Sequence, residues 1–311
     1  MKRNLTGALA ALALSGGALL GASPATAVQT HDAPPTADAR PAPAAPVARS
    51  AASADAVASA TRLAPRAKAV TFEGAVALSN CSGSVVKPPN ATDRDPALVM
   101  SNGHCLEGGF PAPGEVVVDR PSSRDFTILD AQARDLGTVR ATKIAYATMT
   151  DTDVSLYQVN ATYADIRQRF GVRPLALSAT HPRAGTAISV VSGYWKKQYT
   201  CSVDGFVHEL REGRWTWKDS VRYTPQCQTI GGTSGSPVVD TATGAVIAVN
   251  NTGNESGGRC TDNNPCEVDE NGKITVRRGI NYGQQTYQIT RCLAAGNKVN
   301  LSLPECTLPK P

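Results

Sequence analysis

Short runs of apolar residues recur along most of the chain, and breaks rich in Gly, Pro and Asn separate them. The runs are rich in Val, Ile, Thr and Tyr, and residues 153–159 alternate apolar with polar side chains, as a strand with one buried face does. We therefore predict β-strands in the clearest of these runs, which are residues 75–78, 84–87, 97–100, 115–118, 154–159 and 186–191.

Helical periodicity is rare in this sequence. Residues 165–170 and 284–295 are the segments that carry it, and we predict a helix in each. No internal repeat with a period of about 20 to 50 residues is visible, which argues against a propeller or a solenoid. Many short strands then leave an all-β sandwich or barrel as the fold class.

The first 27 residues predict export. Lys2 and Arg3 precede an apolar stretch at residues 5–20, and Ala-Thr-Ala at residues 25–27 offers a small-residue cleavage site. The apolar stretch is about 16 residues long, whereas a membrane span needs about 20. We expect a signal peptide at residues 1–27, a mature chain that begins at Val28, and a secreted, extracellular protein.

Residues 28–68 are dominated by Ala and Pro and contain few large apolar side chains. Such a segment has too little to bury, and we expect a linker or a pro-segment. The folded domain is then expected at residues 69–311. The composition of the 311 residues, 41% hydrophobic and 18% charged, is ordinary for a globular protein.

The net charge and the cysteine content of the chain argue against several classes of function. The formal charge of +5 falls to +3 without Lys2 and Arg3, and the other Lys and Arg residues are scattered. We therefore expect neither nucleic acid nor a membrane surface as a partner. Eight cysteines in an exported chain favour four disulfides, and no C-x-x-C spacing suggests a metal site. Their pairing is open at this point.

Residues 231–237, Gly-Gly-Thr-Ser-Gly-Ser-Pro, are the strongest candidate for chemistry. Glycines on both sides of Ser234 allow a sharp turn that presents its hydroxyl. A serine hydroxyl is a poor nucleophile at neutral pH, so it needs a base, and the base needs a partner that holds its tautomer. The alternative is an ordinary Gly/Ser/Thr loop.

His104 is the best candidate for the base. It follows the strand at residues 97–100 and precedes Cys105, so a disulfide would hold it rigidly. His31 lies in the Ala/Pro segment, and His181 and His208 lie in polar surroundings typical of surface histidines. For His104 itself, the alternative is a packed histidine beside a disulfide.

Asp153 is the candidate for the third group. It opens the strand at residues 154–159, where a buried carboxylate needs a partner such as an imidazole N–H. That pair would hold the tautomer whose other nitrogen can accept the Ser234 proton. The alternative role, a turn aspartate, fits Asp151 better.

Four stretches together resemble the secreted bacterial serine peptidases of the trypsin and chymotrypsin family. They are Asn-Cys-Ser-Gly-Ser at 80–84, Ser-Asn-Gly-His-Cys at 101–105, Asp-Val-Ser-Leu at 153–156 and Gly-Thr-Ser-Gly-Ser-Pro at 232–237. They occur in the family's order, His then Asp then Ser, and the resemblance spans about residues 72–293.

The resemblance implies two six-stranded antiparallel β-barrels with a C-terminal helix, and a substrate cleft between the barrels. It implies Ser234 as the nucleophile, His104 as the proton carrier and Asp153 as the group that orients the imidazole. The backbone N–H groups of Gly232 and Ser234 would form the oxyanion hole. Substrates would be polypeptides, the protein a monomer, and neither a metal nor an organic cofactor is required.

The same resemblance places the first barrel at about residues 69–170 and the second at about residues 171–311. It also pairs Cys81 with Cys105. We expect the remaining pairs to be sequential neighbours as well, and two of them close short loops. These pairs are Cys201–Cys227, Cys260–Cys266 and Cys292–Cys306.

Three positions depart from the family pattern. Thr233 stands where most animal relatives carry an aspartate that pairs with a newly cleaved N-terminus. Gln228, which resembles the base of the primary specificity pocket, is not an acid, so Lys or Arg specificity loses its usual counter-charge there. Asn250 stands where glutamate-specific relatives carry a histidine.

An apparent insertion at residues 257–279 contains the acidic run 267–272, which faintly resembles a calcium loop. We predict a hairpin turn at Asn271 and Gly272 instead, because Arg278 replaces the glutamate that would close a calcium site.

Two other functions match parts of the sequence. The α/β-hydrolase esterases also place serine between glycines, but Ser236 replaces the second glycine here and no histidine follows Ser234. A secreted binding protein on an impaired protease scaffold is the second alternative, and the presence of all three candidate residues argues against it. We predict a secreted serine endopeptidase that acts through an acyl-enzyme.

Overall fold

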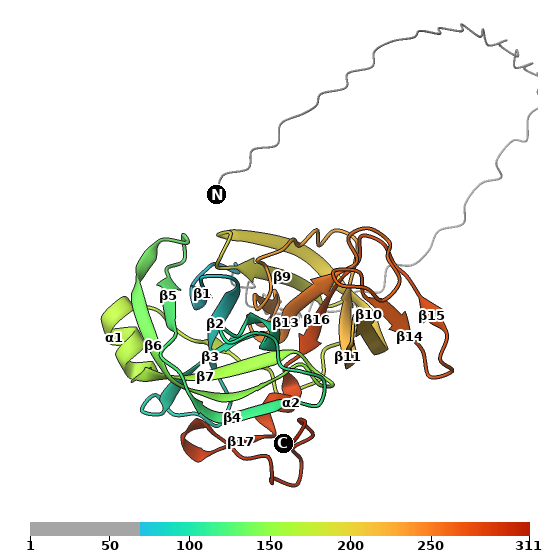
Figure 1. Cartoon of the computed structure of the whole chain (residues 1–311). Coiled ribbons are helices and arrows are strands. Elements are labelled where there is room, and N and C mark those ends of the chain that lie inside the picture. Colours follow the sequence, from blue (N-terminus) through green and yellow to red (C-terminus); the bar gives the residue numbers. More distant parts are fainter. Residues whose placement is uncertain (1–68) are drawn as a thin grey trace, which may run out of the picture. The chain divides into compact units, whose positions relative to one another are not determined.

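The computed structural model describes residues 69–311, and strands dominate it (Figure 1). Six strands close into a first barrel in the order β1-β5-β6-β7-β3-β2, with β2 pairing back to β1 and every pair antiparallel. Their bounds are β1 Ala75–Ala77, β2 Ser82–Lys87, β3 Pro96–Ser101, β5 Asp125–Leu129, β6 Asp135–Thr148 and β7 Val154–Thr162. β4 (Val116–Pro121) pairs with β6, and β8 (Leu175–Ala176) runs parallel to β2.

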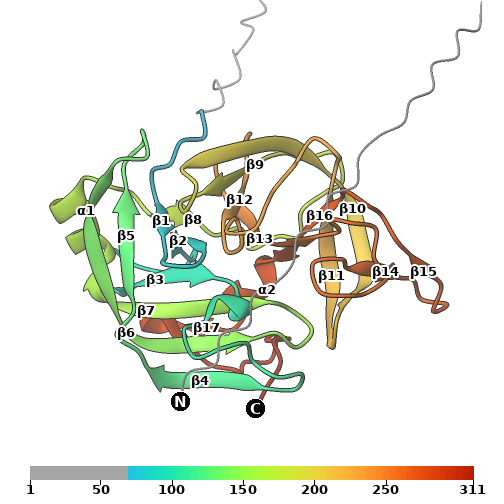
Figure 2. The same ribbon diagram turned by 45° about the horizontal axis from the view of Figure 1, so that its top comes forward.

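A second six-stranded antiparallel barrel follows in the order β11-β16-β13-β12-β9-β10, closed by the pairing of β10 with β11. Its strands are β9 Ala187–Ser192, β10 Lys197–Glu212, β11 Trp215–Tyr223, β12 Pro237–Asp240, β13 Val246–Gly253 and β16 Asn281–Gln285. The fold class is therefore the predicted one, and Figure 2 shows the two groups of strands on either side of α2.

Each barrel encloses its own apolar core, and a further buried cluster joins the two. Phe126 and Tyr157 lie inside the first barrel. The joining cluster brings Met100 and Leu156 of the first barrel together with Val249 of the second. Burial of one such side chain contributes about 1.5–3 kcal/mol, so the apolar cluster between the barrels stabilises their contact.

All six strands predicted from the sequence are present, with ends shifted by a few residues. The predicted helix at residues 165–170 is also present as α1 (Tyr163–Phe170). Thr162 and Asp165 form a reciprocal capping box at its start, and Gly171 ends it in the left-handed conformation with φ 68°.

The predicted helix at residues 284–295 is much shorter in the structure, where α2 covers only Tyr287–Thr290. Gln284 and Gln285 instead belong to β16 and pair with β13. After α2 the chain forms β17 (Leu293–Ala294), the 3-10 turn η2 (Ala295–Asn297) and β18 (Lys298–Val299). Sheet pairing before the segment and a tight hairpin after it override the local periodicity.

The four predicted disulfides are confirmed. They are Cys81–Cys105, Cys201–Cys227, Cys260–Cys266 and Cys292–Cys306. Cys81–Cys105 joins the residue before β2 to the end of the 3-10 turn η1 (Gly103–Cys105), which follows β3. Cys292–Cys306 joins the segment just after α2 to the segment that follows β18.

The insertion forms the predicted hairpin. β14 (Cys266–Val268) pairs with β15 (Ile274–Thr275), and Gly272 turns the chain with φ +78°. The Glu267 carboxylate accepts hydrogen bonds from Arg222 and Arg277, so its oxygens serve an ion-pair network rather than a calcium ion.

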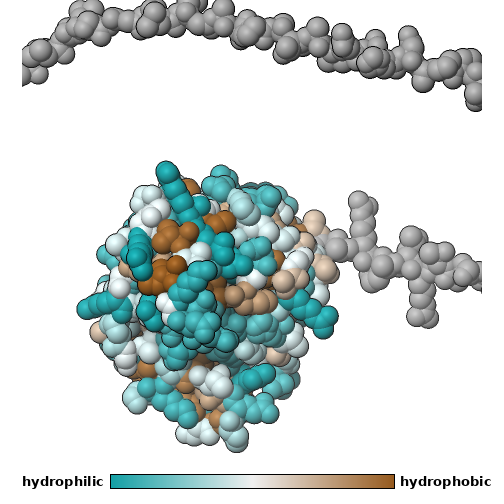
Figure 3. Space-filling view, turned by 90° about the vertical axis from the view of Figure 1, so that its right-hand side faces the viewer, coloured by the Kyte–Doolittle hydropathy of each residue, from teal (hydrophilic) through white to brown (hydrophobic). Residues whose placement is uncertain are grey.

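The predicted signal peptide at residues 1–27 and the segment at residues 28–68 lie outside the described residues. Between residues 69 and 311, no helix is both long enough and apolar enough to cross a membrane. The face shown in Figure 3 is mostly hydrophilic, and hydrophobic side chains form separate patches on it.

Candidate active site

Ser234 lies on a sharp turn that leads into β12, and two glycines make that turn possible. Gly232 has φ +86° and Gly235 has φ +79°, values that favour glycine. A Cβ on Gly235 would also lie 2.1 Å from the Ser82 carbonyl oxygen. The glycines around the candidate nucleophile are therefore required by backbone geometry, as the sequence indicated.

His104 is held rigidly at the end of the first barrel. It lies in the 3-10 turn η1 (Gly103–Cys105), which directly follows β3 and ends at a disulfide. The neighbouring Asn102 side chain donates to the Asp153 carbonyl at 2.8 Å, and the Ser155 hydroxyl donates to the Asn102 carbonyl at 2.8 Å. These buried bonds fix the position of His104 relative to β7.

The Asp153 carboxylate binds His104 twice. One oxygen, Oδ2, lies 2.6 Å from His104 Nδ1, and the other accepts the His104 backbone N–H at 3.1 Å. Asp153 is fully buried. Because an ionised carboxylate only accepts, Nδ1 must carry the proton, which leaves Nε2 as an acceptor.

The groups around His104 stabilise the protonated form of its imidazole relative to that of an isolated histidine. Burial by itself lowers the pKa of His104, but the Asp153 charge, the hydrogen bond to Asp153 and the Glu212 charge outweigh it and raise the pKa above its usual value. An imidazole that takes up a proton from Ser234 would be stabilised by the same groups.

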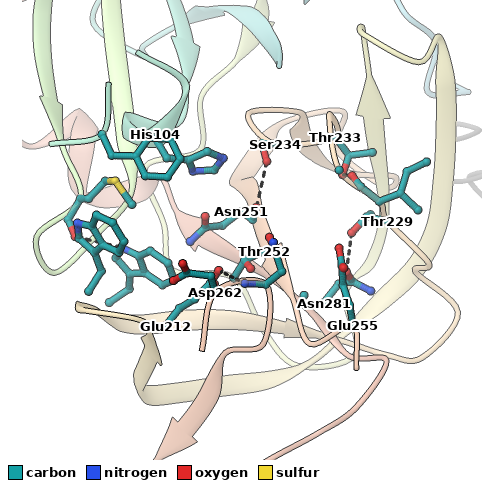
Figure 4. A pocket seen from close by; sticks show the side chains of 18 residues that line it. His104, Glu212, Thr229, Thr233, Ser234, Asn251, Thr252, Glu255, Asp262 and Asn281 are labelled. Carbon is teal, nitrogen blue, oxygen red and sulfur yellow. Dashed lines mark hydrogen bonds between the residues drawn. The ribbon is translucent and has the colours of Figure 1, made fainter. Parts of the chain in front are cut away.

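His104 and Ser234 line one cavity of about 470 Å³. Figure 4 shows the imidazole and the hydroxyl facing each other across its upper part. The Ser234 hydroxyl donates to the Asn251 carbonyl at 3.3 Å, and no hydrogen bond joins it to His104 among the described residues. Catalytic hydrogen bonds often tighten only when substrate binds.

The loop before Ser234 presents two N–H groups with no acceptor. In residues 69–311, neither Gly232 nor Ser234 donates a backbone hydrogen bond. The loop carbonyls are engaged, because Trp195 Nε1 donates to the Gly231 oxygen at 2.7 Å and the Ser82 hydroxyl donates to the Gly232 oxygen at 3.2 Å. Two free donors beside a hydroxyl can stabilise a developing oxyanion.

Exposed apolar side chains concentrate around this site. Phe110 is 56% exposed and Ile230 is 53% exposed, and both line the cavity. Trp195, 48% exposed, and Tyr194 lie against the Gly232 backbone. Such a patch around a cleft is typical of a surface that binds another polypeptide.

The structure places Gln228 outside the cavity, contrary to the expected position at its base. Gln228 is exposed and donates from Nε2 to the Pro225 carbonyl at 2.6 Å. Thr229 and Asn281 line the cavity instead, joined by a 2.8 Å hydrogen bond between their side chains. The position that aligns with the pocket base in sequence thus turns outward in this chain.

Sequence reasoning also missed Glu212, which lies at the end of β10 and is 9% exposed. It lines the cavity, and its Oε1 accepts the Asn263 N–H at 2.8 Å. Burial raises the pKa of Glu212, while Thr252, the Asn263 N–H and the charge of His104 act in the opposite direction. Nothing near Glu212 in the sequence marks it, because only folding brings β10 to the cleft.

The other described histidines lie away from the cavity. His181 is part-exposed and lies 3.2 Å from an Asp219 carboxylate oxygen, and His208 is exposed on β10. His31 lies outside the described residues. Asp151, expected as a turn residue, has φ 57° in the turn before Asp153.

One group of side chains in residues 69–311 has the spacing of metal ligands: Cys81, His104 and Cys105. Its two sulfurs form a disulfide, so they cannot serve as thiolate ligands.

A family model matches more than half of the chain. The family model of the trypsin-like peptidase domain matches residues 81–249. Among solved structures, the active form of the Rv3671c protease from M. tuberculosis is similar, with 14% identity and a TM-score of 0.45, over 78% of this chain and 85% of that one. The MamO protease domain from Magnetospirillum magneticum has 12% identity and a TM-score of 0.45, over 72% and 97%. No curated protein sequence matches.

Proposed function

The chain belongs to the family of trypsin-like peptidases, and on that premise we propose that it is a secreted serine endopeptidase that cleaves polypeptides through an acyl-enzyme. One observation carries the proposal. A serine hydroxyl and a histidine held by a buried carboxylate line a single cavity, and two backbone N–H groups of the serine's loop have no backbone acceptor among residues 69–311.

In the proposed mechanism, Ser234 Oγ attacks the scissile carbonyl carbon while His104 Nε2 takes up the hydroxyl proton. The Gly232 and Ser234 N–H groups donate to the oxyanion of the tetrahedral intermediate. His104 then gives its proton to the leaving amine, and an ester on Ser234 remains. Asp153 orients the imidazole and stabilises the imidazolium.

Deacylation repeats the sequence with water. His104 accepts a proton from the water, the hydroxide attacks the ester carbonyl, and the proton returns to Ser234 as the acid leaves. These steps need only the chain's own residues and water.

The four disulfides fit a non-reducing compartment, which supports the proposed secretion and a signal peptide at residues 1–27. We also propose that residues 28–68 are a linker or a removed pro-segment, and that the enzyme acts as a monomer on polypeptide substrates.

Incubation of the purified protein with casein tests the proposed activity. We expect new peptide fragments, and we expect a serine-directed acylating reagent to abolish their formation and to add its mass to the peptide that contains Ser234. Binding of polypeptide without any cleavage or acylation would instead identify an impaired protease scaffold that acts as a binding protein.

Thr233 predicts that activity does not depend on a defined N-terminus. It is buried, its hydroxyl donates to the Ile230 carbonyl, and it accepts from Asn250 Nδ2 at 3.1 Å. A buried ammonium would therefore find no counter-charge at this position, which makes it unsuited to a charge-paired activation switch.

Proteins that begin anywhere between Val28 and Ala67 should therefore show similar turnover per active site. Active-site titration followed by kinetics on a graded series of N-terminal truncations measures this. If activity required a single start residue, and one additional alanine before it removed turnover, the chain would contain an activation switch at another position.

A further inference from the structure

Glu212 is a buried acid in the lining of the cavity. It is 9% exposed, Oε1 accepts the Asn263 N–H, and the Thr252 side chain also favours the ionised form of this carboxylate. No Lys or Arg among residues 69–311 contributes to the electrostatics of this carboxylate, and a buried carboxylate is stabilised by a nearby positive charge, which a ligand could supply.

The ionisable groups that line the cavity are predominantly acidic. Asp262 and Glu255 line it together with Glu212, and His104 is the one basic side chain in the lining. Figure 4 places Glu212 and Asp262 on the His104 side of the cavity, and Glu255 with Asn281 on the opposite side. A positively charged ligand group is therefore favoured over a negative one on the His104 side.

An aromatic wall lies beside Glu212. The Phe110 ring is 5.6 Å from the His104 ring and 5.8 Å from the Trp215 ring, and Trp217 also lines the cavity. The chain's own Arg214 lies 4.8 Å from the centre of the Trp215 ring without lining the cavity. Aromatic faces of this kind accept the aliphatic stem and the charge of a basic side chain.

The wall is anchored to the first barrel. Trp215 Nε1 donates to the Pro111 carbonyl at 2.9 Å, and Trp217 Nε1 donates to the Met149 carbonyl at 3.1 Å. The hairpin of β10 and β11 therefore presents its acid and its rings in a fixed geometry, and little conformational freedom is lost on binding.

We propose that the His104 side of this cavity binds a Lys or Arg side chain of the substrate near the scissile bond, with its charge close to the Glu212 carboxylate and its stem along Trp215 and Phe110. This inference rests on the proposed function. Selectivity for a basic residue then comes from β10, not from the residue that resembles the base of the primary pocket, because Gln228 points outside the cavity.

Matched peptides test the proposal. Starting from an uncharged peptide, each position around the cleaved bond is replaced in turn by arginine or by its uncharged isostere citrulline. The kcat/KM values of the two peptides are then compared at each position. At one position we expect the wild-type protein to prefer arginine by about tenfold or more, as for a hydrogen bond between charged groups. Glu212→Gln should remove that preference, which is read as the ratio of kcat/KM for the two peptides within each protein, because the Glu212 charge also acts on His104.

Two controls make the outcome specific. Gln keeps an oxygen that can accept the Asn263 N–H, so Glu212→Gln preserves the local fold, which thermal unfolding verifies. Glu270→Gln removes the same charge from an exposed turn beyond β14, outside the cavity, and should leave the arginine preference intact.

Equilibrium binding to a Ser234→Ala protein separates this inference from the proposed activity. The arginine peptide should bind about tenfold more tightly than the citrulline peptide, and Glu212→Gln in the same background should make them equal. Equal binding of both peptides to the Ser234→Ala protein overturns the inference, as does a preference that survives Glu212→Gln. If the wild-type protein cleaved neither peptide but the Ser234→Ala protein still bound the arginine peptide more tightly, only the proposed endopeptidase activity would be refuted.

Discussion

Replacement of Ser234 by alanine is expected to lower kcat by roughly 10⁶-fold, and His104→Ala by about as much. The hydroxyl is useless as a nucleophile without the base, and the base has nothing to deprotonate without the hydroxyl. The double variant should therefore be no slower than either single one. Initial rates on one peptide, with enzyme concentration high enough to detect slow turnover, measure all three.

Matched variants away from the cavity control for folding. Ser302→Ala changes an exposed serine in the C-terminal segment, and His208→Ala changes an exposed histidine on β10. Both should retain wild-type rates. Turnover of more than a few per cent in Ser234→Ala, or losses that multiply in the double variant, would show that these residues do not act as one unit.

Asp153→Asn is expected to lower kcat by about 10⁴-fold while leaving the fold intact. Asp153 accepts from both the backbone and the ring of His104, and an amide can supply only one accepting oxygen. If that oxygen serves the backbone N–H, the amide NH₂ faces Nδ1 and stabilises the tautomer with its proton on Nε2. That tautomer cannot accept the Ser234 proton.

Asp153→Asn should also shift the low-pH side (the acid limb) of the kcat/KM profile to lower pH. His104 must be neutral to act as a base, so kcat/KM falls as pH drops through its pKa. The negative charge of Asp153 and its hydrogen bond raise that pKa, so their loss lowers it and shifts the limb to lower pH. Asp219→Asn, which alters the part-exposed pair with His181, should change neither rate nor profile. An acid limb that stays in place would contradict the assignment of Asp153.

The local chemistry of the chain was predictable from sequence because it depends on near neighbours. Apolar runs of β-branched residues between turn formers predicted six strands that the structure contains. Glycines around Ser234 predicted a sharp turn, which the structure contains with positive φ at Gly232 and Gly235, and a cysteine beside His104 predicted a covalent support. The resemblance in the order of motifs added the two barrels and the pairing of His104 with Asp153, which local pattern alone leaves open.

The tertiary structure decided what lines the cleft. The length of α2 was limited by the pairing of β16 with β13, a contact between distant segments that local periodicity does not encode. Gln228 turned outward while Thr229 and Asn281 met across the cavity. Glu212 reached the cleft because the long hairpin of β10 and β11 folds against the loops of the first barrel. The candidate catalytic residues thus lie in short motifs that the sequence displays, whereas the other side chains that line the cavity are brought together only by long-range packing.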